Sequence, residues 1–79
     1  MKLKILKVTK KPSKNGGFFY YISFGDKEGS GYYTYINPRM KNSHRWKKVM
    51  KEGTILTHLR LRNNRLIDAD SRFQIGESL

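Results

Sequence analysis

The sequence contains no cysteine and no long hydrophobic segment. Without cysteine the chain has no disulfide, no thiolate zinc site, no iron–sulfur cluster and no cysteine nucleophile. Its longest apolar run covers residues 18–22, far fewer than the ~20 residues that a membrane-spanning helix needs. The lysine-rich start also lacks the apolar segment of a signal peptide. We therefore expect a soluble, cytoplasmic protein with no membrane partner.

Acidic residues are also scarce, and their scarcity leaves the chain strongly positive. Seventeen Lys and Arg face six Asp and Glu among 79 residues, so the formal net charge is +11. Residues 1–14 and 39–51 each carry six cations and no acid. A chain with this charge repels itself and is expected to sit beside a polyanion, either a nucleic acid or an anionic membrane surface. Two merely solvated basic faces are the alternative interpretation.

Groups that could perform catalysis or hold a metal ion are few. His44 and His58 lie in different segments, without a cysteine or an acidic residue at ligand spacing. Asp68 and Asp70 share one face of an expected strand, but two carboxylates are too few for a dedicated cation site. No glycine pattern fits a nucleotide-binding fingerprint. We expect no cofactor, no metal and no enzymatic activity; a small basic ribonuclease that uses the two histidines is a minor alternative.

Turn residues divide the chain into short strand-like segments and one helix-like segment. Polar and hydrophobic residues alternate from Lys2 to Ile5. The alternation then shifts by one residue, so that Leu6 and Val8 form the hydrophobic side and Lys7 and Thr9 the polar side. This pattern over residues 2–9 predicts a strand with one bulge. Further strands are expected at 18–24, at 32–36, at 54–62, and from Arg65 through Asp70 with an extension that can reach Phe73 and Ile75.

A helix is expected between the third and fourth of these strands. Trp46, Val49 and Met50 recur at helical spacing and predict a helix over about 43–51, with Gly53 placed to end it. We expect Trp46 to close one end of a barrel. The fold class follows from this order: a mainly β, single domain over residues 1–79, in the form of a five-stranded OB-fold barrel with one short helix between strands 3 and 4. An SH3-like barrel is the main competitor, but it usually lacks a helix there.

The two aromatic strands divide into an inner and an outer set because side chains alternate across a strand. Taking Ile22, Phe24 and Ile36 as core residues directs a second group inward: Phe18, Tyr20, Tyr32 and Thr34. Four aromatic side chains are left outside: Phe19, Tyr21, Tyr33 and Tyr35. Such a patch is costly for a soluble monomer unless something covers it. Bases of a single strand could do so, since stacking contributes about 1–3 kcal/mol per base.

Basic side chains are expected beside this aromatic patch, on the outward positions of the first and fourth strands and in the loop 10–17. The predicted nucleic-acid-binding residues are Phe19, Tyr21, Tyr33, Tyr35, Lys4, Lys7, Lys14, His58, Arg60 and Arg62. Cations that flank rings in this way form a groove for the backbone of a single strand. A duplex would instead need a helix in its groove, and Arg45, Lys47 and Lys48 are the candidates for that alternative.

Several segments of the chain together resemble one protein family. They are the opening MKLKILKV, the glycine turn KNGG that leads into FFYY, the strand YYTY, and the closing LRLRNNRLIDADS. In these segments the chain is similar to the small OB-fold, helix-destabilising single-stranded DNA-binding proteins of bacteriophages and related mobile elements. The resemblance implies that DNA is bound by Phe19, Tyr21, Tyr33, Tyr35, Lys7, Arg60 and Arg62. The end of the chain, IGESL, differs from the acidic tail by which cellular single-strand-binding proteins recruit partners, and the basic helix is more prominent than in filamentous-phage members.

We therefore expect a non-enzymatic protein that binds single-stranded DNA without sequence preference. It would serve the replication or recombination of a phage or mobile element in the cytoplasm of a bacterial host. RNA is an alternative nucleic acid, and a homodimer or higher oligomer is the expected assembly. A protein of a different class is the main alternative: a small basic interaction module whose aromatic face docks on an acidic host enzyme and inhibits it.

Overall fold

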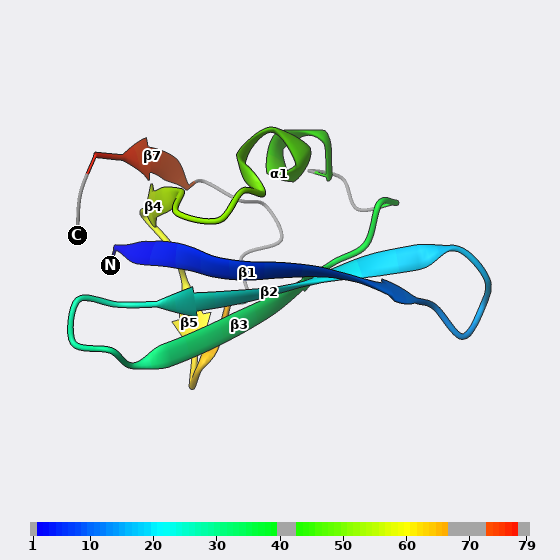
Figure 1. Cartoon of the computed structure of the whole chain (residues 1–79), viewed down its shortest axis with the longest axis horizontal. Coiled ribbons are helices and arrows are strands. Elements are labelled where there is room, and N and C mark those ends of the chain that lie inside the picture. The colour runs from blue at the N-terminus through cyan, green and yellow to red at the C-terminus, as the bar shows by residue number, and fades with distance from the viewer. Residues whose placement is uncertain (1, 40–42, 67–72, 78–79) are drawn as a thin grey trace.

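The computed structural model describes residues 2–39, 43–66 and 73–77. In these ranges the chain is mainly β, with seven strands and one short helix (Figure 1). The elements in chain order are β1 (Leu3–Pro12), β2 (Phe18–Gly25), β3 (Gly31–Ile36), α1 (Ser43–Val49), β4 (Ile55–Thr57), β5 (Leu61–Arg62), β6 (Arg65–Leu66) and β7 (Gln74–Gly76). The predicted fold class is confirmed in its coarse form, including the helix between the third and fourth strands.

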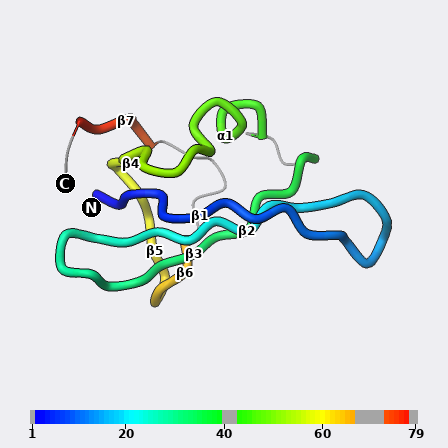
Figure 2. The backbone as a smooth tube through the Cα atoms, in the orientation of Figure 1, coloured from blue at the N-terminus to red at the C-terminus, as the bar shows by residue number. Residues whose placement is uncertain are grey.

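The seven strands form one sheet in the order β5-β6-β3-β2-β1-β4-β7. β1, β2 and β3 pair antiparallel, β4 pairs antiparallel with β1, and β6 pairs parallel with β3. β5 lies at one edge and β4 near the other, yet only residues 58–60 separate them in the chain. The sheet must therefore curl into a half-barrel, and Figure 2 shows the chain crossing from β4 beside β1 to β5 and β6 beside β3.

The described residues contain seven strands where five are expected, and one expected strand is interrupted within them. β4 and β5 occupy the strand predicted at 54–62, but His58 has a φ of 61°, a left-handed conformation that a regular strand does not accommodate. The bend at 58–60 therefore divides that strand. β6 and β7 occupy the two ends of the predicted last strand, and residues 67–70 of that prediction lie outside the described residues.

The predicted bulge in the first strand is present, but its extra residue lies outside. The pairing of β1 with β2 shifts register between Ile5 and Lys7. Val8 packs against the core as expected, whereas the Leu6 side chain is 53% exposed. Leu6 lies over Gly25, with its Cδ1 atom 3.0 Å from the position that a Cβ on that glycine would take. Leu6 is thus the unpaired residue of the bulge, and the absent Cβ of Gly25 gives it room.

The core lies between the concave side of the sheet and α1. Its buried residues are Leu3, Ile5, Ile22, Phe24, Ile36, Trp46, Val49, Leu56, Leu66 and Phe73. Trp46 is almost fully buried and its ring centroid lies 4.6 Å from that of Phe73 and 6.5 Å from that of Phe24. The helix that carries Trp46 has seven residues and ends at Val49, two residues before the predicted end. Trp46 is thus a core residue that packs between α1 and the concave side of the sheet.

The predicted inner set lies on the concave side, and all of its members except Phe18 contact the core. Thr34 is buried and its hydroxyl donates a hydrogen bond to the carbonyl oxygen of Leu66 at 3.2 Å. Tyr20 and Tyr32 are half-buried against the core. Phe18 is only half-buried and is not part of the core. Its side of the sheet was predicted correctly, but the hairpin of β1 and β2 continues past the core before it turns.

This continuation, residues 9–21, is called the arm. Its strands pair from Thr9 and Tyr21 out to Pro12 and Phe18, and it extends beyond the other elements along the longest dimension of the molecule, 37 Å (Figure 1). The connecting loop 13–17 is held by two backbone hydrogen bonds between Ser13 and the pair Gly16 and Gly17. Both glycines have positive φ, 83° and 75°, which side chains rarely adopt.

Candidate nucleic-acid interface

Four aromatic rings form one continuous patch on the convex side of β2 and β3. Tyr35 is at its centre: its ring centroid lies 5.3 Å from Tyr21, 5.7 Å from Phe19 and 5.8 Å from Tyr33. Tyr21 and Tyr33 are stacked at 6.0 Å. Tyr35 is 42% exposed and the other three rings are half-buried. These four residues, the predicted outer set, are called the aromatic face.

Strand pairing explains why these rings meet. Tyr21 on β2 lies directly opposite Tyr35 on β3, and Ser23 lies opposite Tyr33. Because alternate residues point to the same side of a sheet, Phe19 and Tyr21 share the convex side with Tyr33 and Tyr35. The four rings therefore pack on one another. Within the described residues, the hydrophobic core lies on the other side of the sheet and does not cover them.

Basic side chains surround the aromatic face. The Nζ atom of Lys11 lies 5.2 Å from the ring centroid of Tyr21, and the guanidinium of Arg65 lies 5.5 Å from that of Tyr35. Lys4 and Lys7 occupy convex positions further along β1, where their register partners are Gly25 and Ser23. Lys4, Lys7 and Lys11 thus line one side of the patch. Cations this close to aromatic faces are attracted by the ring quadrupole.

Sequence reasoning missed Lys11 and Arg65. The segment from residue 10 to residue 17 was predicted as a loop, although β1 continues to Pro12 and carries Lys11 on the same side as Lys7. From the sequence, Arg65 is expected to begin the last strand and is not among the predicted binding residues. The parallel pairing of Arg65 with Tyr33 brings it to the aromatic face, and neither propensity nor alternation within one strand predicts a pairing between distant strands.

The cations predicted on the fourth strand lie in two different places: one in β5 and two in the bend between β4 and β5. Arg62 is exposed in β5 and lines a hollow of about 410 Å³ together with Tyr33, Asn63, Asn64 and Arg65. His58 and Arg60 lie in the bend between β4 and β5, where strand alternation no longer applies. The His58 ring is hydrogen-bonded at 2.8 Å to the Thr57 hydroxyl. Arg62 is therefore the predicted fourth-strand cation that the structure brings beside the aromatic face.

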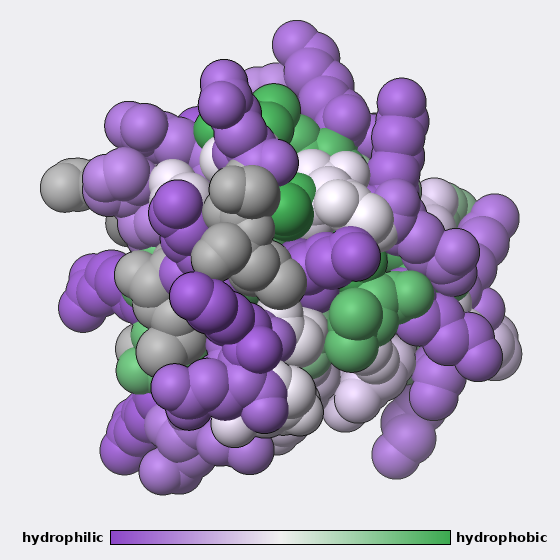
Figure 3. Space-filling model, turned by 60° about the vertical axis from the view of Figure 1, so that its left-hand side comes forward, coloured by the Kyte–Doolittle hydropathy of each residue, from purple (hydrophilic) through white to green (hydrophobic). Residues whose placement is uncertain are grey.

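Lys14 lies in the loop 13–17 at the tip of the arm, where its side chain is exposed. A second hollow of about 390 Å³ lies between the arm and the end of β3, and it is lined by Ser13, Phe19, Tyr35, Asn37 and Arg65. Figure 3 shows how hydrophilic side chains project around separate, small hydrophobic patches on one side of the molecule. At the candidate interface itself, flat rings lie beside the long cationic side chains of Lys11 and Arg65.

The arginine that the duplex alternative needs from the helix has contacts of its own within the molecule. The guanidinium of Arg45 donates a hydrogen bond to the Phe73 carbonyl oxygen and lies 4.3 Å from the centroid of the Phe73 ring. Arg45 is half-buried by these contacts. Lys47 and Lys48 are exposed. Arg45 therefore ties α1 to the segment that carries Phe73, and these contacts compete with any binding of Arg45 to base edges.

Two acidic residues, Asp26 and Glu28, lie on either side of Lys27 in the turn that joins β2 and β3, at the opposite end of that hairpin from the arm. The carboxylate of Asp26 accepts hydrogen bonds from the backbone N–H groups of Glu28 at 2.9 Å and Ser30 at 2.8 Å, and from the Tyr32 hydroxyl at 3.1 Å. The Ser30 hydrogen bond is the main cause that lowers the pKa of Asp26, and the hydrogen bond to Asp26 raises the pKa of Tyr32. Because residues 1–25 contain no acidic residue and the turn contains two, the charge along the hairpin favours a polyanion toward the arm.

Within the described residues, no group of three or more histidine, aspartate or glutamate side chains could hold a metal ion, and no helix is long and apolar enough to cross a membrane. Comparisons of the chain with protein-family models, with curated proteins and with solved structures give no match. The functional proposal therefore depends on the geometry of the aromatic face and on its charge.

Proposed function

We propose that the protein binds single-stranded DNA, without sequence preference, across the aromatic face. The observation that carries this proposal is the contact of four rings on the convex side of β2 and β3, with Lys11 and Arg65 within 5.5 Å of two of them. Each base has a flat face that can stack on a ring whatever its identity. The cations neutralise phosphates, and this contribution is also independent of sequence.

Single strands suit this surface better than a duplex does. The rings lie on a convex sheet and need free base faces, which a duplex keeps inside its own stack. Major-groove reading normally uses a helix or a two-stranded ribbon whose side chains reach base edges. The helical candidate Arg45 is already bonded to the Phe73 carbonyl oxygen. The expected role, in the replication or recombination of a phage or mobile element, fits such a surface.

We also propose that the half-barrel is an OB fold. In this interpretation β4 and β5 together form the fourth barrel strand, and β6 and β7 form the fifth. The parallel pairing of β3 with β6, the antiparallel pairing of β1 with β4 and the position of α1 support it. OB folds bind oligonucleotides on the face of strands 2 and 3 and on the loops between strands 1–2 and 4–5. Here those loops are 13–17 and 63–64, which flank the aromatic face.

The test is a titration of a fluorescent oligo(dT) of about 16 nucleotides, with unlabelled duplex of the same length as competitor, at two or more salt concentrations. We expect tight binding of the single strand, weak competition by the duplex, and a fall in log affinity with log salt of about 0.7 per phosphate neutralised. Preference for the duplex, or an affinity independent of salt, would contradict the proposal. Tighter binding of oligo(U) would assign the interface to RNA.

A further inference from the structure

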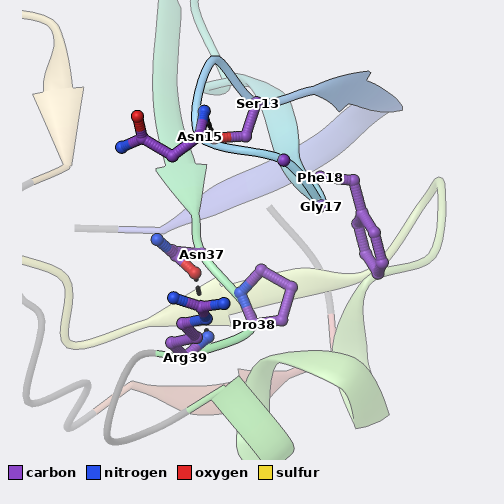
Figure 4. A pocket seen from close by; sticks show the side chains of 8 residues that line it. Ser13, Asn15, Gly17, Phe18, Asn37, Pro38 and Arg39 are labelled. Carbon is purple, nitrogen blue, oxygen red and sulfur yellow. Dashed lines mark hydrogen bonds between the residues drawn. The ribbon is translucent and has the colours of Figure 1, made fainter.

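A third hollow lies between the loop 13–17 at the tip of the arm and the stretch of chain that follows β3, next to but apart from the aromatic face. It encloses about 250 Å³, and its lining comes from two segments: the loop 13–17 with Phe18, and the stretch Asn37–Arg39 that follows β3. Figure 4 shows these two segments on opposite sides of the space, with Phe18 at one side and Pro38 and Arg39 below. This space is called the arm hollow.

The chemistry of the arm hollow suits an anion that carries a flat ring. Phe18 is half-buried outside the core, and the Nζ atom of Lys10 lies 4.0 Å from its ring centroid. Arg39 is exposed at the hollow, where its backbone N–H donates a 2.9 Å hydrogen bond to the Asn37 side-chain oxygen. Residues 1–25 and 29–51, which include the whole lining, contain no acidic residue. Nothing in these segments therefore repels a phosphate.

The glycine turn leaves the hollow open on the side of the loop. A Cβ built on Gly16 or on Gly17 would have no atom within 4 Å, so the backbone of the loop is directly accessible there. Both residues have positive φ, so a larger residue would be strained at either position. A ligand can thus approach the main chain closely, as the phosphate backbone of a nucleic acid requires.

The three hollows are connected, because each one shares lining residues with the next. The hollow at the turn 63–64 and the one beside Phe19 share Arg65. The hollow beside Phe19 and the arm hollow share Ser13 and Asn37. One path therefore leads from the turn 63–64, over the aromatic face, around the end of β3 and to Phe18 on the concave side of the arm.

We propose that the arm hollow is an end subsite of the single-strand path, taking one further nucleotide with its base against Phe18 and its phosphate beside Arg39. This inference rests on the proposed function, because it presupposes a strand on the aromatic face. The volume of about 250 Å³ falls below the range of about 300–1,000 Å³ of pockets for drug-sized molecules, so the subsite has room for one unit only. The strand thus wraps around the edge of the sheet and does not end on its convex side.

The experiment is a length series of oligo(dT), from about 4 to about 16 nucleotides, titrated against the full chain and against Phe18→Ala and Arg39→Ala. We expect both variants to bind the shortest oligomers as the unaltered protein does. They should bind long oligomers at least about fivefold more weakly, the lower end of the effect of one base stack. Their affinity should therefore stop rising with length earlier than that of the unaltered chain.

Three control variants make the result specific. Tyr35→Ala, on the aromatic face, should weaken binding at every length, and Lys48→Ala, an exposed cation of α1, should not change the length at which affinity stops rising. Phe18→Tyr keeps a ring and should restore the long-oligomer affinity. Equal losses at all lengths, or no loss, in both Phe18→Ala and Arg39→Ala would overturn the end subsite. If the unaltered protein binds no oligomer, the proposed function itself fails, which is a distinguishable result.

Discussion

The two sides of β2 and β3 carry similar aromatic side chains in different surroundings. On the concave side, Phe24 is 1% exposed and packs against Trp46. On the convex side, Tyr35 is 42% exposed and contacts other rings and the guanidinium of Arg65. Composition alone does not separate these roles, since adjacent residues of one strand belong to both. What separates them is whether another layer of the molecule covers the ring, and only the concave side has such a layer within the described residues.

Removal of a concave ring should have the largest effect on the protein. Phe24→Ala would leave a cavity beside Trp46 and should lower the free energy of unfolding by about 3–5 kcal/mol. This is a large share of the ~5–15 kcal/mol that stabilises a typical domain. Urea unfolding followed by tryptophan fluorescence measures the change, because Trp46 is the single tryptophan. Wild-type stability in this variant would show that Phe24 does not support the core.

Removal of a convex ring should act on binding and leave folding almost unchanged. Tyr35→Ala deletes the ring that contacts the other three, and we expect single-strand binding to weaken by about 1–3 kcal/mol. The matched variant Tyr35→Phe keeps the ring and should bind almost normally. A binding titration and a thermal melt on each variant decide the matter. If Tyr35→Ala unfolded the protein while Phe24→Ala only weakened binding, the roles of the two sides would be reversed.

The sequence predicted the sides of the strands well, because alternation is a local property. Ile22, Phe24 and Ile36 point inward and the four outer rings lie together on the convex side. Alternation does not reveal where the core ends along a strand, and for that reason Phe18 was expected in the core although it lies on the arm. Leu6 was grouped with Val8 on the inner side, but it is exposed. A break in the alternation shows that a bulge is present, but it does not show which residue of the strand is left unpaired.

The remaining differences come from interactions between distant parts of the chain. The break at His58 depends on the path from β4 to β5 around the half-barrel, and no propensity of histidine predicts it. Arg65 reaches the aromatic face only through its parallel pairing with Tyr33. Arg45 is a candidate for duplex contacts by its place on a basic helix, but its bond to the Phe73 carbonyl oxygen competes with that role. Local patterns therefore identified the rings of the candidate site better than its cations.

The cations around the convex rings should have a smaller effect, visible mainly in the salt dependence. The double variant Arg62→Ala with Arg65→Ala removes two charges beside Tyr33 and Tyr35. Each phosphate that the variant no longer neutralises should make the slope of log affinity against log salt shallower by about 0.7. Lys47→Ala with Lys48→Ala removes the same charge from α1 and is the matched control. If both double variants changed the slope equally, net charge alone and not the position beside the rings would govern binding.

The smallest expected effect concerns the turn that joins β2 and β3. There the hydroxyl of Tyr32, a member of the predicted inner set, donates a hydrogen bond to Asp26. The hydrogen bonds lower the pKa of Asp26 below its ordinary value of 3.8, so the carboxylate form stabilises the folded state. This contribution is fully present above pH 3.8 and is lost as the pH falls through the lowered pKa of the folded protein.

Asp26→Asn removes this titration, and because the hydrogen bonds from Glu28 and Ser30 to the carboxylate are exposed to solvent, the effect on stability is small. Thermal melts of both proteins from about pH 6 to about pH 2 measure it. The melting temperature of Asp26→Asn should lie below that of the unaltered chain at the upper end, and the difference should shrink as Asp26 becomes protonated. The repulsion among the many cations affects both proteins in the same direction, so it largely cancels in the difference. A gap that stays constant across this range would mean that Asp26 holds the turn by its shape and not by its charge.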